Sequence, residues 1–162
     1  MMYFICKSTA KTTMSDEIYD QQKGHEPVYI NEQYKTIIMA DHDEGNLVIA
    51  KNSLDDIYNV FTVPSGKTLF LLLESIKPDL ILLDIEISDM DGYEIIDTLK
   101  RSGETAHIPL ILLFPGINPG CGNKVPDTGA TDYIKKPFTG KFLAKRVEKL
   151  FHIEARKEGK EK

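Results

Sequence analysis

The sequence predicts an α/β fold in which a doubly wound, five-stranded parallel sheet is flanked by helices. Short apolar runs such as Leu80–Leu83 lie between turn signals, as expected of strands that are buried on both faces. These runs alternate with segments of helical length, and such alternation is typical of parallel sheets with right-handed crossovers. A chain of 162 residues, 41% hydrophobic and 28% charged, fits one globular domain.

Each expected element has a local signal in the sequence. The five strands are expected at Lys35–Ala40, Val60–Val63, Leu80–Asp84, Leu110–Leu113 and Asp132–Lys135, and the third and fourth are runs of Ile and Leu. Four helices are expected at Asn46–Tyr58, from Ser65 to Ile76, at Tyr93–Arg101 and at Gly140–Phe151. Leu47, Leu54 and Ile57 recur at helical spacing in the first helix. Lys77-Pro78-Asp79 ends the second, because proline cannot continue a helix.

Residues that can do chemistry follow three of these strands. Asp84 ends the central apolar run and precedes the turn Asp89-Met90-Asp91-Gly92, while Asp41-His42-Asp43-Glu44 follows the first strand. Lys136-Pro137-Phe138 follows the fifth strand. Parallel strands open on a crevice at their carboxyl ends. A lone aspartate would more often cap a helix, but three such strand ends predict that acids and a lysine converge on one site.

In their order and near spacings, the three motifs resemble the receiver domain of two-component response regulators, from about Tyr34 to His152. The resemblance implies that Asp84 accepts a phosphoryl group and that Lys136 pairs with Asp84 or with the phosphoryl oxygens. It also implies Mg²⁺ as cofactor, held by Asp41, Asp84 and the backbone carbonyl of Glu86. A divalent cation and a lysine lower the repulsion between the carboxylate and the incoming phosphoryl group.

The chain departs from the family pattern at two positions next to this site. The second acid after the first strand is replaced by His42, and imidazole is a poorer ligand for Mg²⁺ than carboxylate. Asp43 is the neighbouring acid that could take over as a ligand. The usual Ser or Thr after the fourth strand is replaced by Phe114, which cannot bond to a phosphoryl group. The resemblance also implies a cis bond between Lys136 and Pro137.

The surface that carries output in this family is altered as well. Proline and glycine crowd the segment after Phe114, so the helix expected there is short or irregular. Tyr133 matches the aromatic switch position of the family, and it equally fits an edge-strand aromatic that covers the core. The same surface serves dimerisation in the family, which leaves a homodimer open.

The remaining features of the sequence limit the classes of protein to which the chain can belong. Residues 1–33 are expected to be a disordered or extended segment, and residues 153–162 a charged tail. Cys6 and Cys121 form no metal or disulfide pattern, and a cytoplasmic location is the simplest expectation. Apolar runs such as Leu69–Leu73 are too short to cross a membrane. The net charge of −5 argues against direct nucleic-acid binding.

The sequence therefore predicts a signalling phosphoacceptor, and not an enzyme. Its expected partners are a histidine kinase or phosphotransfer protein, which would dock along the first helix, and a downstream protein. The alternative is a degenerate receiver that acts as a phosphorylation-independent binding module, which His42 and Phe114 favour. An FMN-binding protein ranks last, because the acidic loop Asp41–Glu44 would repel a phosphate.

Overall fold

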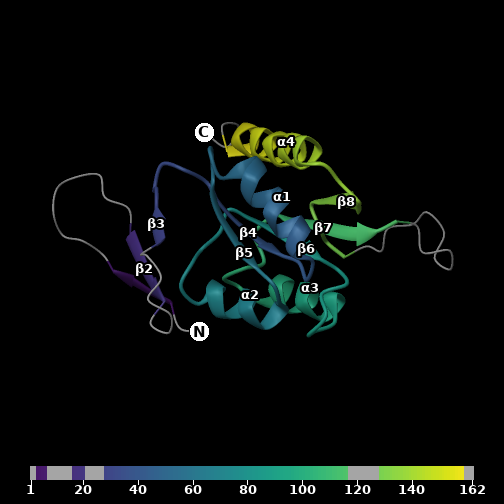
Figure 1. Ribbon diagram of the computed structural model, residues 1–162, viewed down its shortest axis with the longest axis horizontal. Coiled ribbons are helices and arrows are strands. Elements are labelled where there is room, and N and C mark those ends of the chain that lie inside the picture. The colour runs from purple at the N-terminus through teal and green to yellow at the C-terminus, as the bar shows by residue number, and fades with distance from the viewer. Residues whose placement is uncertain (1–2, 7–15, 21–27, 117–127, 159–162) are drawn as a thin grey trace.

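The computed structural model describes residues 3–6, 16–20, 28–116 and 128–158, and it confirms the predicted five-stranded parallel sheet (Figure 1). The strand order is β5-β4-β6-β7-β8. The strands are β4 (Thr36–Ala40), β5 (Asn59–Val63), β6 (Leu80–Asp84), β7 (Leu110–Pro115) and β8 (Asp132–Lys136). The helices are α1 (Glu44–Leu54), α2 (Gly66–Leu73), α3 (Gly92–Arg101) and α4 (Gly140–Glu158). The irregular helix expected after Phe114 lies in 117–127, outside the described residues.

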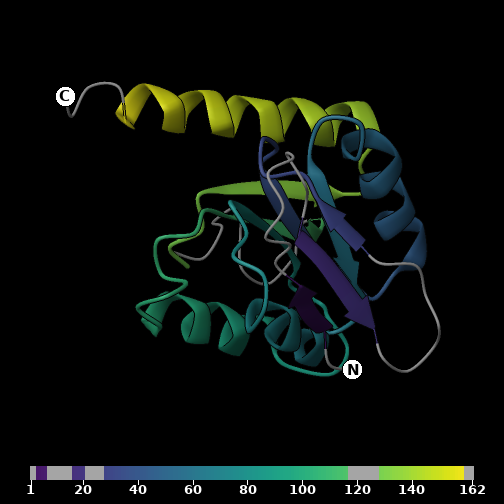
Figure 2. The same ribbon diagram turned by 90° about the vertical axis from the view of Figure 1, so that its left-hand side faces the viewer.

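Helices cover both faces of the sheet. In Figures 1 and 2, α1 and α4 lie on one side of it and α2 and α3 on the other. Successive residues of a strand point to opposite faces, so Ile81 and Leu83 of β6 join the cluster under α2 and α3. Leu80 and Leu82 join the cluster under α1 and α4. Because every position of β4 and β6 is buried, the ends of these two strands are rigid supports for a site.

The last helix is longer than the sequence analysis expected. It continues past Phe151 to Glu158, so the segment assigned to a charged tail begins as helix. The residues from Glu154 onward, Glu-Ala-Arg-Lys-Glu, are strong helix formers, and this local preference extends the helix although the apolar periodicity has ended. The first helix also differs, since it ends at Leu54 and not at Tyr58.

A second, antiparallel sheet lies in the N-terminal segment. Its strands are β1 (Tyr3–Cys6), β2 (Asp16–Asp20) and β3 (Val28–Ile30), in the order β1-β2-β3. The sequence analysis expected a disordered or extended segment and did not anticipate this pairing. The reason is that strands this short satisfy one another's backbone groups without leaving a clear hydrophobic period.

The junction between the two sheets is held by a few contacts. Ile30 is partly buried and packs against the core cluster under α2 and α3. The amide of Asn31 donates to Oδ1 of Asn59 at 3.0 Å, and Nδ2 of Asn59 donates back to the Asn31 carbonyl at 2.9 Å. Among the described strands, β1, β2 and β3 pair with one another and not with the five-stranded sheet.

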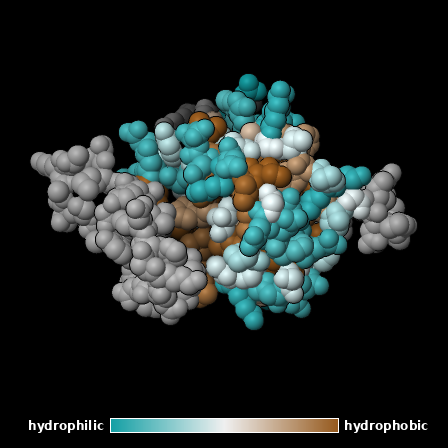
Figure 3. All heavy atoms as spheres, in the orientation of Figure 1, coloured by the Kyte–Doolittle hydropathy of each residue, from teal (hydrophilic) through white to brown (hydrophobic). Residues whose placement is uncertain are grey.

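One face of the molecule shows how hydrophilic and hydrophobic residues are distributed on the surface. Figure 3 shows hydrophilic residues over most of one face, with hydrophobic residues visible between them. None of the helices among the described residues combines the length and apolar character needed to cross a membrane.

The junction predicts where the chain can be shortened. A protein starting at Ile30 should have a melting temperature within about 3 °C of that of the complete chain. The packing of Ile30 against the core and the hydrogen bond from Asn31 to Asn59 both remain in it. A protein starting at Tyr34 should lose about 1–2 kcal/mol of unfolding free energy, because it loses both contacts. Thermal and urea unfolding measure both. A drop of 10 °C or so for the first protein would show that β1–β3 support the domain.

Candidate functional site

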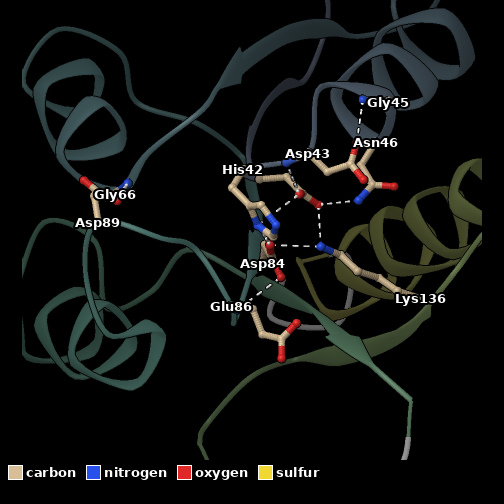
Figure 4. Close-up of polar contacts among 10 residues, drawn as sticks. His42, Asp43, Gly45, Asn46, Gly66, Asp84, Glu86, Asp89 and Lys136 are labelled. Carbon is tan, nitrogen blue, oxygen red and sulfur yellow. Dashed lines mark hydrogen bonds and ion pairs between the residues drawn. The ribbon is translucent and has the colours of Figure 1, made fainter.

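Three strand ends meet at one point, as predicted. Asp41 follows β4, Asp84 ends β6 and Lys136 ends β8. The ammonium group of Lys136 lies 2.8 Å from Oδ2 of Asp41 and 2.9 Å from Oδ2 of Asp84 (Figure 4). Both aspartates are fully buried, and the Lys136 side chain is only 14% exposed. One cation therefore bridges two buried carboxylates.

The two carboxylates are held in place by further donors. The amide of Asp43 donates to Oδ1 of Asp41 at 2.9 Å, and the side-chain amide of Asn46 donates to Oδ2 at 3.0 Å. The amide of Glu86 donates to Oδ1 of Asp84 at 3.1 Å. Burial raises the pKa of the Asp41 carboxyl above its ordinary value, against the opposing effect of the hydrogen bond from Lys136. The site therefore holds an excess of buried negative charge that favours a cation.

His42 lies against the same carboxylates. Its Nδ1 is 2.8 Å from Oδ2 of Asp84 and 3.9 Å from Oδ1 of Asp41. Because an ionised carboxylate only accepts hydrogen bonds, the 2.8 Å contact requires a proton on Nδ1. The His42 side chain is 44% exposed, so the ring lies between the buried carboxylates and solvent.

Asp43 is not brought into the site as a ligand. It is the N-cap of α1, where its Oδ1 accepts from the amide of Gly45 at 2.8 Å. The side chain is exposed, and capping satisfies one of the free amides at the start of the helix. Its backbone amide supports Asp41 instead.

The loop after Asp84 is shaped by helix caps and by one close backbone approach. Asp91 is the N-cap of α3, and its carboxylate accepts from the amides of Tyr93 and Glu94. A Cβ at Gly92 would collide with the carbonyl of Ile85, so this position requires glycine. The turn therefore packs directly under the residues that follow Asp84.

The same loop is tied to α2 by Asp89. Its two carboxylate oxygens accept from the amides of Gly66 at 2.8 Å and Lys67 at 3.0 Å. The sequence analysis missed this role and that of Asn46. Two signals in the sequence could have found them. Asp89 is an acid in the loop after the central strand, and Asn46 is a polar residue in the first turn after an acidic strand end.

The expected switch residues lie on β7 and β8. Phe114 stands opposite Lys135 in the parallel pairing of the two strands and is partly buried. Tyr133 is partly buried, packs against the core, and its hydroxyl lies 3.0 Å from that of Thr128. The Lys136–Pro137 peptide bond is cis, as the resemblance implied.

The comparisons with known proteins agree with this geometry. The family model of the response regulator receiver domain matches residues 37–148. The chain belongs to this family. The response regulator PleD of Caulobacter vibrioides is 32% identical over 117 residues, which cover 70% of this chain and 25% of that protein. A protein of Vibrio cholerae named probable cyclic di-GMP phosphodiesterase is 35% identical over 112 residues, or 69% of this chain and 25% of that protein.

A solved structure shares the fold of this receiver domain. The signal receiver domain of a signal transduction histidine kinase from Syntrophus aciditrophicus is 29% identical, with a TM-score of 0.64, and the match covers 72% of this chain and 89% of that one. The receiver domain spans about a quarter of the two curated relatives. Phosphoryl acceptance is the role of the family, whose members interact with histidine kinases or phosphotransfer proteins.

The residues of the crevice fit a divalent cation in part. Receiver domains generally bind Mg²⁺, and the buried oxygens of Asp41 and Asp84 are the hard ligands that this ion prefers. The third side chain of the cluster is His42, which offers nitrogen in place of oxygen. The donor set is therefore mixed.

Asp89 gives a test of how the loop is held. Partial burial would raise the pKa of the Asp89 carboxyl, but the amides of Lys67 and Gly66 outweigh this and lower it below the ordinary 3.8. A lowered pKa stabilises the folded state above pH 3.8, and this stability is lost as the pH falls through the lowered value. Because water screens this exposed carboxylate, Asp89→Asn should reduce the unfolding free energy by only about 0.5–1 kcal/mol near neutral pH.

Urea unfolding at several pH values measures this effect. The difference between Asp89→Asn and the parent should vanish once the pH falls below the lowered pKa of Asp89. The matched control is Asp97→Asn on the surface of α3, where an exposed pair with Arg101 is lost at about 0.3 kcal/mol. Equal losses for the two variants would refute the capping role.

Proposed function

We propose that this receiver domain accepts a phosphoryl group on Asp84 from a phosphohistidine of a histidine kinase or phosphotransfer protein. The observation that carries the proposal is the contact between Lys136 and a fully buried Asp84 at the end of β6. A carboxylate oxygen attacks phosphorus, the bond from phosphorus to the imidazole nitrogen breaks, and an acyl phosphate forms. The ammonium of Lys136 offsets the negative charge that gathers on the phosphoryl oxygens.

A metal ion supports this step in the family, and Asp41, Asp84 and the carbonyl of Glu86 would hold it here. The ion lowers the repulsion between the carboxylate and the phosphoryl group. Since His42 stands where a second acid is usual, we propose that Mg²⁺ binds weakly.

The partner surface is proposed along α1. Val48 on this helix is 55% exposed although it is hydrophobic, and the helix begins directly beside the crevice. A partner that donates to Asp84 must approach this end of the sheet. The signal is proposed to pass to a downstream protein in the cytoplasm, with the surface of β8 and α4 also able to serve a homodimer.

The first test concerns the phosphoacceptor. Acetyl phosphate with MgCl₂ should add one phosphoryl group to the protein, because among the described residues Asp84 is the acid that ends the central strand β6 and contacts Lys136. Mass spectrometry of the intact chain should show this addition lost in Asp84→Asn and retained in Asp91→Asn, which keeps a cap at α3. Phosphorylation that persists in Asp84→Asn would sink the proposal.

The second test concerns Mg²⁺. Replacing the imidazole by a carboxylate in His42→Asp should tighten Mg²⁺ binding by about 1–3 kcal/mol, or roughly 5- to 150-fold. Calorimetric titration measures this directly. An unchanged affinity would mean that position 42 does not face the ion.

A second candidate function is a binding module in which phosphorylation is uncoupled from output. Phe114 favours it, because a ligand shifts an equilibrium only by interacting differently with the two states, and Phe114 offers no hydroxyl to the phosphoryl group.

This candidate predicts a local response to the phosphoryl mimic beryllofluoride. In NMR spectra at saturating MgCl₂, shifts should cluster at Asp41, Asp84 and Lys136 and fade before Tyr133. Phe114→Thr restores the hydroxyl and should extend the shifts to Tyr133 and α4. Large shifts at Tyr133 in the parent chain would favour the phosphorylation-dependent switch instead.

A further inference from the structure

The imidazole of His42 is placed as a metal ligand would be. Its Nδ1 lies 2.8 Å from an oxygen of Asp84 and 3.9 Å from an oxygen of Asp41. Figure 4 shows the ring turned toward these carboxylates and Lys136 approaching Asp84 from another side. Asp41, His42 and Asp84 each offer one atom within 4.8 Å of the others, and no other such group of three occurs in the part of the chain that the structure describes.

The surrounding contacts leave the carboxylates oriented for this role. Asp41 is fixed by the amides of Asp43 and Asn46, and Asp84 by the amide of Glu86. Hydrogen bonds of this kind orient metal-binding carboxylates and raise the affinity of a site. Oδ1 of Asp41 and Oδ1 of Asp84 each accept one hydrogen bond and keep a further lone pair, whereas both Oδ2 atoms already have two partners.

The donor set decides which ion this arrangement suits. Carboxylate, carbonyl and water oxygens suit Mg²⁺, whereas imidazole suits Zn²⁺ and other first-row transition ions. Mg²⁺ also demands near-ideal octahedral oxygen geometry, which a half-exposed ring at position 42 interrupts. Two carboxylates and one imidazole form the mixed set expected of a transition-metal site.

We propose that Asp41, His42 and Asp84 form a site that prefers a first-row transition-metal dication of the Zn²⁺ type over Mg²⁺, with Nδ1 of His42 as a direct ligand. Binding replaces the hydrogen bond from Nδ1 to Asp84 by a bond to the metal, so the ring proton must move to Nε2 of the part-exposed side chain. The inference rests on the proposed function in one respect, which is that the bound ion assists phosphorylation of Asp84.

The test is calorimetric titration of the metal-free protein near neutral pH, with ZnCl₂ and MgCl₂ in separate runs and no phosphodonor. The parent chain should bind Zn²⁺ at least about 100-fold more tightly than Mg²⁺. His42→Gln should lose at least about tenfold in Zn²⁺ affinity with little change for Mg²⁺. His42→Asp should gain Mg²⁺ affinity and lose Zn²⁺ affinity. The ratio of Zn²⁺ affinity to Mg²⁺ affinity should therefore be smaller than in the parent chain.

A spectroscopic readout identifies the ligand. Bound Mn²⁺ should show magnetic coupling to a histidine nitrogen in pulsed electron paramagnetic resonance spectra of the parent chain, and this coupling should disappear in His42→Gln. The matched control is His107→Asn, since His107 is exposed and distant in sequence from the cluster. It should leave the affinities and the coupling unchanged.

The outcomes separate this inference from the proposed function. Zn²⁺ binding that is lost in His107→Asn, or unchanged in both variants of His42, would overturn the site. If Asp84 is phosphorylated in MgCl₂ but Zn²⁺ binding does not depend on His42, the transition-metal site is refuted and the proposed function stands. If Zn²⁺ binding depends on His42 but no phosphodonor modifies the chain, the proposed function is refuted and the transition-metal site stands. Circular dichroism should show that all variants are folded.

Discussion

The bridge from Lys136 to two buried carboxylates is the interaction on which the site depends. Asp41 and Asp84 are both fully buried, and two like charges a few ångströms apart repel by about 4 kcal/mol at an effective dielectric of 20. Lys136 offsets this repulsion by bonding both of them. Removing one partner of such a group leaves an uncompensated buried charge, which destabilises a fold more than the intact group stabilises it.

The bridge forms only if the sheet holds the ends of β4, β6 and β8 close together. β4 and β6 are neighbours, but β7 lies between β6 and β8. The Lys136 side chain must therefore reach past the end of β7, where Phe114 and Pro115 stand. The register of the strands aligns Asp41 with Asp84, because Ala40 pairs with Leu83, whereas Asp84 is level with Ile134 and Lys136 lies two residues farther along β8. The core thus determines the geometry of the site, and a shift of one residue in β8 would turn Lys136 away.

The sequence predicted the parts of the molecule that depend on periodicity. The apolar run before Asp84 identified the central strand, and the alternation of strands and helices placed the strand before Lys136 in the same parallel sheet. The N-terminal sheet was not predictable, because three short strands leave no long-range pattern. The capping by Asp43 and Asp89 was missed for a different reason. A carboxylate near a strand end serves a helix or a metal equally well, and only the position of a neighbouring amide decides between them.

The two departures from the family pattern act on different steps. His42 touches the carboxylates themselves, so it bears on which ion is bound and how readily Asp84 is modified. Phe114 lies near the end of β7, opposite Lys135 of the strand that carries Tyr133, so it bears on what a modification does afterwards. Coupling requires that the modified and unmodified states differ in their contacts on that path. Without a hydroxyl at position 114, the contacts left to sense a phosphoryl group are Lys136 and the free backbone amides near Phe114, excluding Pro115. Lys136 ends β8, the strand that also carries Tyr133, so any signal that reaches the output surface must travel through the backbone of that strand.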